Sequence, residues 1–218
     1  MDIIPLGHAS FRLKGKSATV VTDPYDTQIV AYKFPKNTTA HIVTVSHAHP
    51  DHNFTKAVTS EDGELIVFSG PGEYEVRGVE ISGIDSFHDD KEGALRGKNT
   101  IFKFHIDGLT IVHLGDLGHL LTQEQEELLD DVDILLVPCG GFYTIDAKIA
   151  AQVVTALEPS LVIPMHYQKQ DLNPELMKVL TPVSAFLKEV GKEGIVPQPK
   201  LKVTKETLPQ EMQVVILE

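Results

Sequence analysis

Residues 42–52 read IVTVSHAHPDH, an apolar run followed at once by three histidines and an aspartate. The apolar run is typical of a buried β-strand, so the polar cluster lies where the chain leaves the core. Crowded imidazoles repel one another when protonated, whereas a divalent cation binds them in the neutral form together with an ionised carboxylate. Histidines two residues apart on extended backbone point to the same side, while the turn at Pro50 redirects Asp51 and His52. The stretch therefore predicts a metal site whose spacing suggests two ions, with a metal-free His-rich turn as the alternative.

The composition is that of a globular protein with a sizeable core: 218 residues, of which 42% are hydrophobic. We expect a single domain over residues 1–218. Nineteen Lys and Arg against 31 Asp and Glu give a net charge of −12, which disfavours nucleic acid and anionic membranes as partners. The single cysteine, Cys139, excludes an intramolecular disulfide and a cysteine-based zinc finger. With no secretory signal and no membrane-spanning stretch in the sequence, we expect a cytoplasmic protein.

Short strand-like runs separated by turns fill the N-terminal half, and helical patterns come later. The predicted strands are residues 3–6, 10–13, 18–22, 41–45, 65–68, 74–76, 79–87, 100–105, 109–113, 133–137, 161–163, 201–203 and 212–217. The predicted helices are residues 53–58 with Asn53 as N-cap, 122–129 with a Thr122–Gln125 capping box, 146–157 capped by Asp146, and 174–190 interrupted at Pro182. Asp107-Gly108 predicts a hairpin turn. This order indicates layered sheets covered by helices.

Histidine and aspartate recur just past the ends of three other predicted strands. His88 follows the strand over 79–87, Asp116 comes shortly after 109–113, and His166 comes shortly after 161–163. Active sites are commonly assembled from loops on a rigid scaffold. We therefore expect these three residues to converge with residues 47–52 in one site.

Taken in order, these motifs resemble those of the metallo-β-lactamase superfamily. HAHPDH at 47–52 is a complete H-x-H-x-D-H motif, and Asp23, His88, Asp116 and His166 match the remaining motif positions. The resemblance covers most of the chain, from about residue 20 to residue 170. It implies an α+β fold, a four-layer αββα sandwich, and the activity of a metal-dependent hydrolase.

Three further stretches narrow the resemblance. GHAS at 7–10, Gly115-Asp116 and PMHY at 164–167 are most similar to the small hydrolases related to L-ascorbate-6-phosphate lactonase. Class B1 β-lactamases use a cysteine in a ligand role and lack a histidine at the position of His52, so antibiotic hydrolysis is not expected. The flavodiiron branch carries glutamate at the position of His49, which disfavours di-iron redox chemistry.

The family pattern implies two divalent metal ions. One ion would be held by His47, His49 and His88, the other by Asp51, His52 and His166, and both by Asp116. This donor set suits zinc first, with Mn²⁺ or Fe²⁺ as alternatives. The expected reaction is cleavage of an ester-like bond, a lactone or phosphodiester, in a small anionic substrate by a hydroxide between the ions. A non-catalytic metal-containing binding or sensing protein, or a nuclease-type phosphodiesterase, is the alternative, and the oligomeric state is left open.

Four other residues, and Asp51 in a second role, are predicted to act around the ions. His8 and Asp23 would orient ligand residues by hydrogen bonds, with ordinary turn residues as the alternative. His119 is a candidate proton donor to the leaving group or, alternatively, a residue that orients a ligand. Tyr143 could donate a hydrogen bond to an oxyanion, with a turn whose aromatic rings simply pack as the alternative. Asp51, besides ligating, could orient the attacking hydroxide.

Two basic residues in the loop after His88 complete the predicted site. Arg96 and Lys98 are expected to contact a phosphate or carboxylate of the substrate. The alternative is that they are solvated loop charges.

Overall fold

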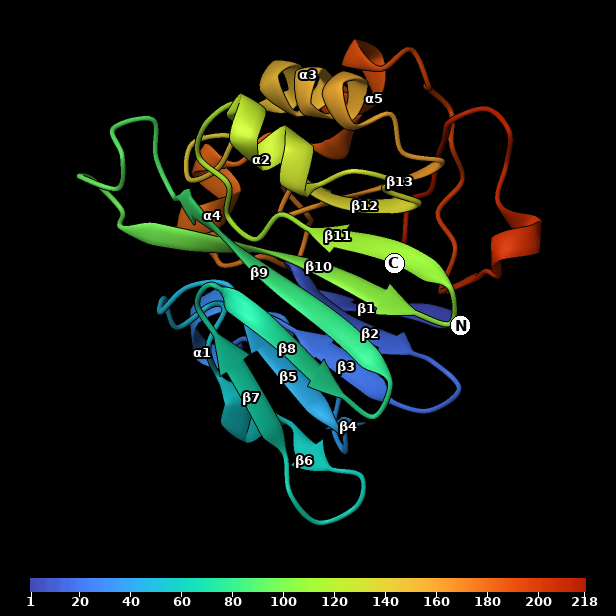
Figure 1. Ribbon diagram of the computed structural model, residues 1–218. Helices are drawn as coiled ribbons and strands as arrows, with labels where there is room; N and C mark the ends of the chain where they lie inside the picture. Colours follow the sequence, from blue (N-terminus) through green and yellow to red (C-terminus); the bar gives the residue numbers. More distant parts are fainter.

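The computed structural model describes residues 1–218. The chain folds into two mixed β-sheets that pack face to face (Figure 1). In spatial order the six strands of the first sheet are β14 (Leu201–Lys202), β1 (Asp2–Gly7), β2 (Ser10–Lys14), β3 (Thr19–Thr22), β5 (Ile42–Val45) and β7 (Ile66–Ser69). β1, β2 and β3 are antiparallel, whereas β3, β5 and β7 run parallel. The carboxyl ends of β3 and β5 therefore lie at the same edge of this sheet.

The second sheet combines an antiparallel meander with a parallel half. In spatial order its seven strands are β15 (Gln213–Val214), β13 (Leu161–Met165), β12 (Ile134–Pro138), β11 (Leu109–His113), β10 (Lys98–Ile106), β9 (Val79–Phe87) and β8 (Gly72–Val76). β8 to β11 alternate in direction, and β11, β12, β13 and β15 are parallel. β9, β11 and β13 consequently end at one common edge. Short strands β4 (Thr39–Ala40) and β6 (Thr59–Ser60) form a separate ladder.

The helices are short and unequally distributed. They are α1 (Thr27–Val30), α2 (Gln123–Leu128), α3 (Ala147–Leu157), α4 (Pro174–Val179) and α5 (Val183–Glu189), with 3-10 turns at Thr55–Ala57 and Lys205–Thr207. α2, α3 and α5 lie over the outer face of the second sheet, and α1 lies on the side of the first sheet (Figure 1). No helix is long and apolar enough to cross a membrane.

Local sequence signals account for the hairpin and for two helix starts. Asp107 and Gly108 have φ of 54° and 79°, the two positive values that a type I′ turn between β10 and β11 requires. Thr122 and Gln125 form the predicted capping box of α2. The Asp146 side chain accepts a hydrogen bond from the backbone of α3, as predicted.

One helix prediction needs correction, and the interruption predicted at Pro182 is confirmed. The predicted helix over 53–58 is only a 3-10 turn, and Asn53 does not cap it because its side-chain amide donates to the carbonyl of Ala48 instead. The predicted helix over 174–190 is two helices, α4 and α5. Pro182 separates them, since proline cannot donate the backbone hydrogen bond of a continuous helix.

The core is divided by the sheets into layers. A cluster of 21 buried residues, among them Ile42, Ile81 and Phe102, fills the space between the two sheets. A second cluster of 20 buried residues packs the outer face of the second sheet against the helices. Only six buried residues form the corresponding cluster on the outer face of the first sheet. The predicted metallo-β-lactamase fold, two mixed sheets with helices, is confirmed, and its outer layer on the first sheet is thin.

Candidate metal centre

The predicted ligands come from strand ends of both sheets and meet at the shared edge. Residues 46–52 follow β5, His88 follows β9, Asp116 follows β11 and His166 follows β13. Parallel alignment within each sheet fixes these ends side by side, so the convergence follows from the strand topology. The structure gathers all seven predicted ligands into two neighbouring groups around Asp116.

The first group consists of His47, His49 and His88, whose ligand atoms all lie within 4.8 Å of one another. The ring centroids of His47 and His88 are 4.7 Å apart, and those of His49 and His88 are 5.1 Å apart. His47 and His88 are buried, whereas His49 is exposed. This group therefore opens to solvent on the side of His49.

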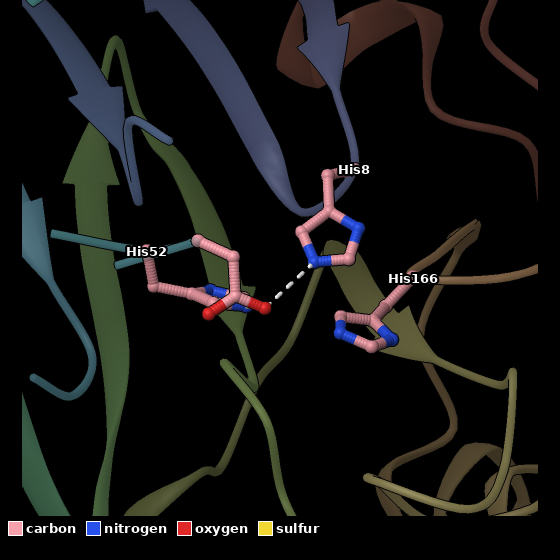
Figure 2. A group of neighbouring side chains, drawn as sticks. His8, His52 and His166 are labelled. Atoms are coloured by element: carbon pink, nitrogen blue, oxygen red, sulfur yellow. Dashed lines mark ion pairs between the residues drawn. The ribbon is translucent and has the colours of Figure 1, made fainter. Parts of the chain in front are cut away.

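The second group consists of Asp51, His52 and His166 together with His8. Figure 2 shows the rings of His8, His52 and His166 facing a common point from three separate segments of the chain. His8 Nε2 lies 3.4 Å from Asp51 Oδ2, and the His8 and His166 ring centroids are 4.1 Å apart. His8 thus faces the Asp51 carboxylate, and its orienting role stays a prediction.

Asp116 lies between the two groups. Its Oδ2 is 3.8 Å from Nε2 of His47 and 3.2 Å from Nε2 of His88 in the first group. In the second group it is 3.3 Å from Nε2 of His52 and 3.4 Å from Nε2 of His166. One carboxylate oxygen therefore faces four imidazole nitrogens, which is the position predicted for a bridging ligand.

Asp23 is hydrogen-bonded to His52 directly and is linked to His47 through Ser46. Its Oδ2 accepts from Nδ1 of His52 at 2.9 Å and from the Ser46 hydroxyl at 2.5 Å, and the hydroxyl in turn lies 2.9 Å from Nδ1 of His47. Each bond places the proton of the ring on Nδ1 and leaves the Nε2 lone pair free to face Asp116. Ser46 was missed from the sequence, although it stands directly before the motif.

Two further polar residues position the Asp116 turn. The Asn99 carbonyl oxygen accepts from the Asp116 backbone N–H at 2.9 Å, and its amide donates to the Leu114 carbonyl at 3.0 Å. His113 Nε2 donates to the carbonyl of Ala9 at 2.8 Å, which ties this turn to the other sheet. A buried asparagine inside an apolar strand is the signal by which Asn99 could have been found.

Left-handed backbone recurs among the site residues. His8, Asp23 and His166 have φ of 54°, 40° and 53°. Such values are uncommon for residues other than glycine and persist only where the surroundings enforce them. Each one follows a strand end, so the left-handed turn redirects the chain where its side chain joins the cluster.

Burial and neighbouring charges shift the pKa values of the clustered side chains. It lowers the pKa of His47 and of His166 to about 3, so both rings are neutral at pH 7, the form that binds a cation. Burial alone would raise the pKa of Asp116, but the surrounding imidazoles of His166 and His52 hold it well below its usual range. Burial would also lower the pKa of His52, yet the Asp116, Asp23 and Asp51 carboxylates raise it well above its usual value.

The residues present fit metal ions. His47 Nε2, His52 Nε2 and Asp116 Oδ1 are buried without a hydrogen-bond partner, a costly arrangement unless a cation completes it. Donors about 2.0–2.2 Å from a tetrahedral ion lie about 3.3–3.6 Å from one another. The separations of 3.2–3.8 Å around Asp116 Oδ2 are close to that range. Imidazole and carboxylate together are donors that suit zinc.

The prediction that His119 donates a proton to the leaving group is not supported by the structure. His119 Nε2 accepts from the Phe87 backbone N–H at 3.1 Å, and Nδ1 donates to the Leu120 carbonyl at 2.6 Å. Both ring nitrogens are therefore engaged by main-chain groups.

Arg96 and Tyr143 meet beside the cluster. The Arg96 guanidinium carbon lies 5.7 Å from the Phe142 ring centroid and 5.6 Å from that of Tyr143, within range of a cation–π contact. Lys98 is exposed, with Nζ 3.5 Å from the Asp85 carboxylate. Arg96 and Lys98 both line a groove of about 550 Å³ that also includes His47 and His49.

The two-sheet fold and the histidine–aspartate cluster define the class: a metal-dependent hydrolase with the metallo-β-lactamase fold. The family model for the beta-lactamase superfamily domain matches residues 2–166. UPF0173 metal-dependent hydrolases of Thermoplasma acidophilum and Pyrococcus abyssi are 31% and 32% identical, over 83% and 74% of this chain and 90% and 82% of theirs. A Thermotoga maritima protein assigned to the zinc-dependent hydrolases of this superfamily has a solved structure with a TM-score of 0.80 and 38% identity, covering 99% of this chain and 97% of that one. The chain belongs to the UPF0173 metal-dependent hydrolase family.

The hydrogen bonds that link Asp23 to His52 and, through Ser46, to His47 should affect metal affinity. Asp23→Asn should lower the affinity for zinc about 10–100-fold, because His52 and, through Ser46, His47 lose the carboxylate that orients them. Competition with a chromophoric chelator measures this affinity. Ser46→Ala, which cuts only the link to His47, should show a smaller loss. An unchanged affinity in Asp23→Asn would show that the network does not support the ligands.

Proposed function

We propose that this metal-dependent hydrolase uses two divalent ions, zinc first, to cleave an ester-like bond in a small anionic substrate, a lactone or a phosphodiester. The observation that carries the proposal is the position of Asp116 Oδ2, within 3.2–3.8 Å of imidazole nitrogens from both ligand groups. A carboxylate shared by two groups is suited to a pair of ions, since a single ion would leave one group without a cation. The resemblance to the L-ascorbate-6-phosphate lactonase branch favours a lactone.

His47, His49 and His88 would hold one ion, Asp51, His52 and His166 the other, and Asp116 both. When bound, the ions supply a water of lowered pKa and polarise the scissile carbonyl or phosphoryl oxygen.

The chain's own contribution includes the handling of a proton at Asp51. Burial would raise the pKa of Asp51, but the neighbouring imidazoles of His8 and His52 hold it below its usual range. Its carboxylate is about one-fifth exposed and so can reach both solvent and the cluster. We assign Asp51 the task of orienting the attacking oxygen and accepting its proton, with His8 steadying the carboxylate at 3.4 Å.

The groove beside the first ligand group would receive the anionic part of the substrate. Its size, about 550 Å³, suits a small molecule. Asp85 offsets the charge of Lys98 at 3.5 Å, whereas Arg96 packs on aromatic rings and keeps its donors for a ligand. Arg96 is therefore the stronger candidate for the anion contact, and the Tyr143 hydroxyl for the developing negative charge.

A substrate panel tests this proposal. Metal-reconstituted protein is assayed on lactones, phosphodiesters, thioesters and β-lactams, and we expect turnover of an anionic lactone or phosphodiester. Arg96→Ala should raise KM for that substrate about 10–100-fold with little change in kcat, because a charge-assisted hydrogen bond is lost in binding. Lys91→Ala, in the same loop and paired with Asp90, is the matched control and should leave KM unchanged. An unaltered KM in Arg96→Ala would refute the anion contact, and no turnover of any panel member would refute the proposed reaction.

A further inference from the structure

Most of the exposed large apolar side chains belong to segments that adjoin the ligand motifs or line the groove beside them. Eight such residues are exposed in the whole chain. Leu128 lies at the end of α2, and Val196 lies between α5 and β14. The other six are Ile29, Phe54, Val67, Leu95, Leu120 and Phe142. An apolar grouping of this kind around a concave site marks an interaction surface.

Backbone contacts tie the first of these residues to the ligand motif. α1, which carries Ile29, is joined to the motif because the Asp26 N–H donates to the carbonyl of Pro50 at 3.1 Å. Phe54 stands two residues after His52, and its N–H donates to the carbonyl of Pro24 at 2.7 Å. The two side chains are 42% and 37% exposed. They therefore border the site on the side of the first sheet.

Leu95 belongs to a loop that a single carboxylate holds in place. Asp89, directly after His88, accepts hydrogen bonds from the backbone N–H groups of Lys91, Gly93, Leu95 and Arg96. These donors hold the pKa of Asp89 below its usual range, although its burial acts in the opposite direction. A loop ordered in this way presents Leu95, 69% exposed, beside Arg96 without a further ordering cost on binding.

Phe142 combines an exposed aromatic ring with a left-handed backbone. It is 59% exposed and has φ of 53°, a conformation that costs energy for a bulky side chain. Its loop is fixed next to Asp116, because the Ile145 N–H donates to the carbonyl of Leu117 at 2.8 Å. The fold thus maintains a strained backbone that keeps an aromatic ring in solvent, next to Arg96 and near the cluster.

Val67 extends this apolar surface into the groove. It lies on β7, is 44% exposed and lines the same groove as His49 and Arg96. A ligand bound at the cluster would therefore meet a cation and apolar side chains together.

We propose that the substrate is amphiphilic: its anionic or ester group binds at the metal centre and Arg96, and an apolar chain or ring lies on Phe142, Leu95 and Val67. The inference rests on the proposed function and narrows its substrate class. The net charge of −12 opposes docking on an anionic membrane, and a protein seated on this face would cover the ligand cluster.

Binding of alkyl phosphonates tests this proposal without requiring turnover. Butylphosphonate and octylphosphonate are titrated into zinc-loaded protein by calorimetry. Each buried methylene contributes up to about fourfold in affinity, so octylphosphonate should bind at least about tenfold more tightly than butylphosphonate. Phe142→Ser should reduce this ratio to less than about threefold. Val196→Ser, which alters an equally apolar residue that is 82% exposed, should leave it unchanged.

Equal affinities of the wild-type protein for the two phosphonates would overturn the proposal. Equal affinities combined with co-sedimentation on phosphatidylcholine vesicles would assign the apolar surface to a lipid bilayer instead. Failure of the proposed function is a separate result, since it appears as absent turnover in the substrate panel whatever the phosphonate ratio.

Discussion

Asp116→Asn should lower kcat/KM by at least about 10³-fold while the protein stays folded. The carboxylate oxygen that faces both ligand groups loses its charge, and a metal centre of this kind supplies several kcal/mol of charge stabilisation. Since each 1.36 kcal/mol is a factor of about ten in rate, a loss of this size is expected. The turn itself should survive, because Asn99 holds the backbone N–H of residue 116 at 2.9 Å and the substitution keeps the shape of the side chain.

The control for Asp116→Asn is a buried aspartate at the far end of the neighbouring strand. Asp133 accepts from the Thr110 N–H at 2.9 Å and pairs with Lys205 at 2.8 Å, away from the cluster. Asp133→Asn should reduce stability and leave kcat/KM within about threefold, the scatter expected of a change remote from the chemistry. If Asp116→Asn retained full activity on the panel substrate, the cluster would not be the active site.

Removal of the metal should lower the melting temperature by about 8–16 °C. A ligand present at 1,000 times its Kd stabilises the native state by about 4 kcal/mol, and about 2–4 °C per kcal/mol applies to a chain of this length. The physical reason is that, without cations, buried imidazole nitrogens and Asp116 Oδ1 have no partner. Thermal unfolding before and after treatment with a chelator measures the difference, and added zinc should restore the original temperature.

Asp23→Asn provides the internal control for this measurement. This variant keeps all the predicted metal ligands but holds them less firmly. A higher zinc concentration should therefore be needed to restore its melting temperature. A chelator-treated wild-type protein that unfolds at the same temperature as the zinc-loaded one would show that the metal does not stabilise the fold.

The clustering of these histidines and aspartates could be predicted because each residue carries its chemistry in its own identity. His88, Asp116 and His166 lie far apart in the chain, yet each follows a strand, and parallel strands end at a common edge. The sheets could be predicted for a similar reason, since apolar runs such as 42–45 are long and unambiguous. The strand ends, and the cluster of side chains that follows them, could therefore be predicted from the sequence.

The hydrogen-bond and contact partners of individual side chains could not be predicted from the sequence in this way. His119 lies three residues from Asp116, but the Phe87 N–H occupies its Nε2, a contact that depends on how β9 meets the following loop. His8 faces Asp51, and its backbone is tied to the other sheet because the His166 N–H donates to the His8 carbonyl at 3.2 Å. Asn53 satisfied the rule for a helix cap and instead bonds Ala48. For His119 and His8 a backbone group from a distant segment decided the outcome, and for Asn53 the deciding group is a carbonyl only five residues away.

Titration of chelator-treated protein with zinc tests the central claim, a two-ion hydrolytic site, most directly. Activity on the panel substrate and bound zinc are measured at each addition. We predict that both rise together and level off at two equivalents per chain, with Asp116→Asn failing to reach the second equivalent. Full activity at one equivalent, or a wild-type protein that takes up no zinc, would contradict the account.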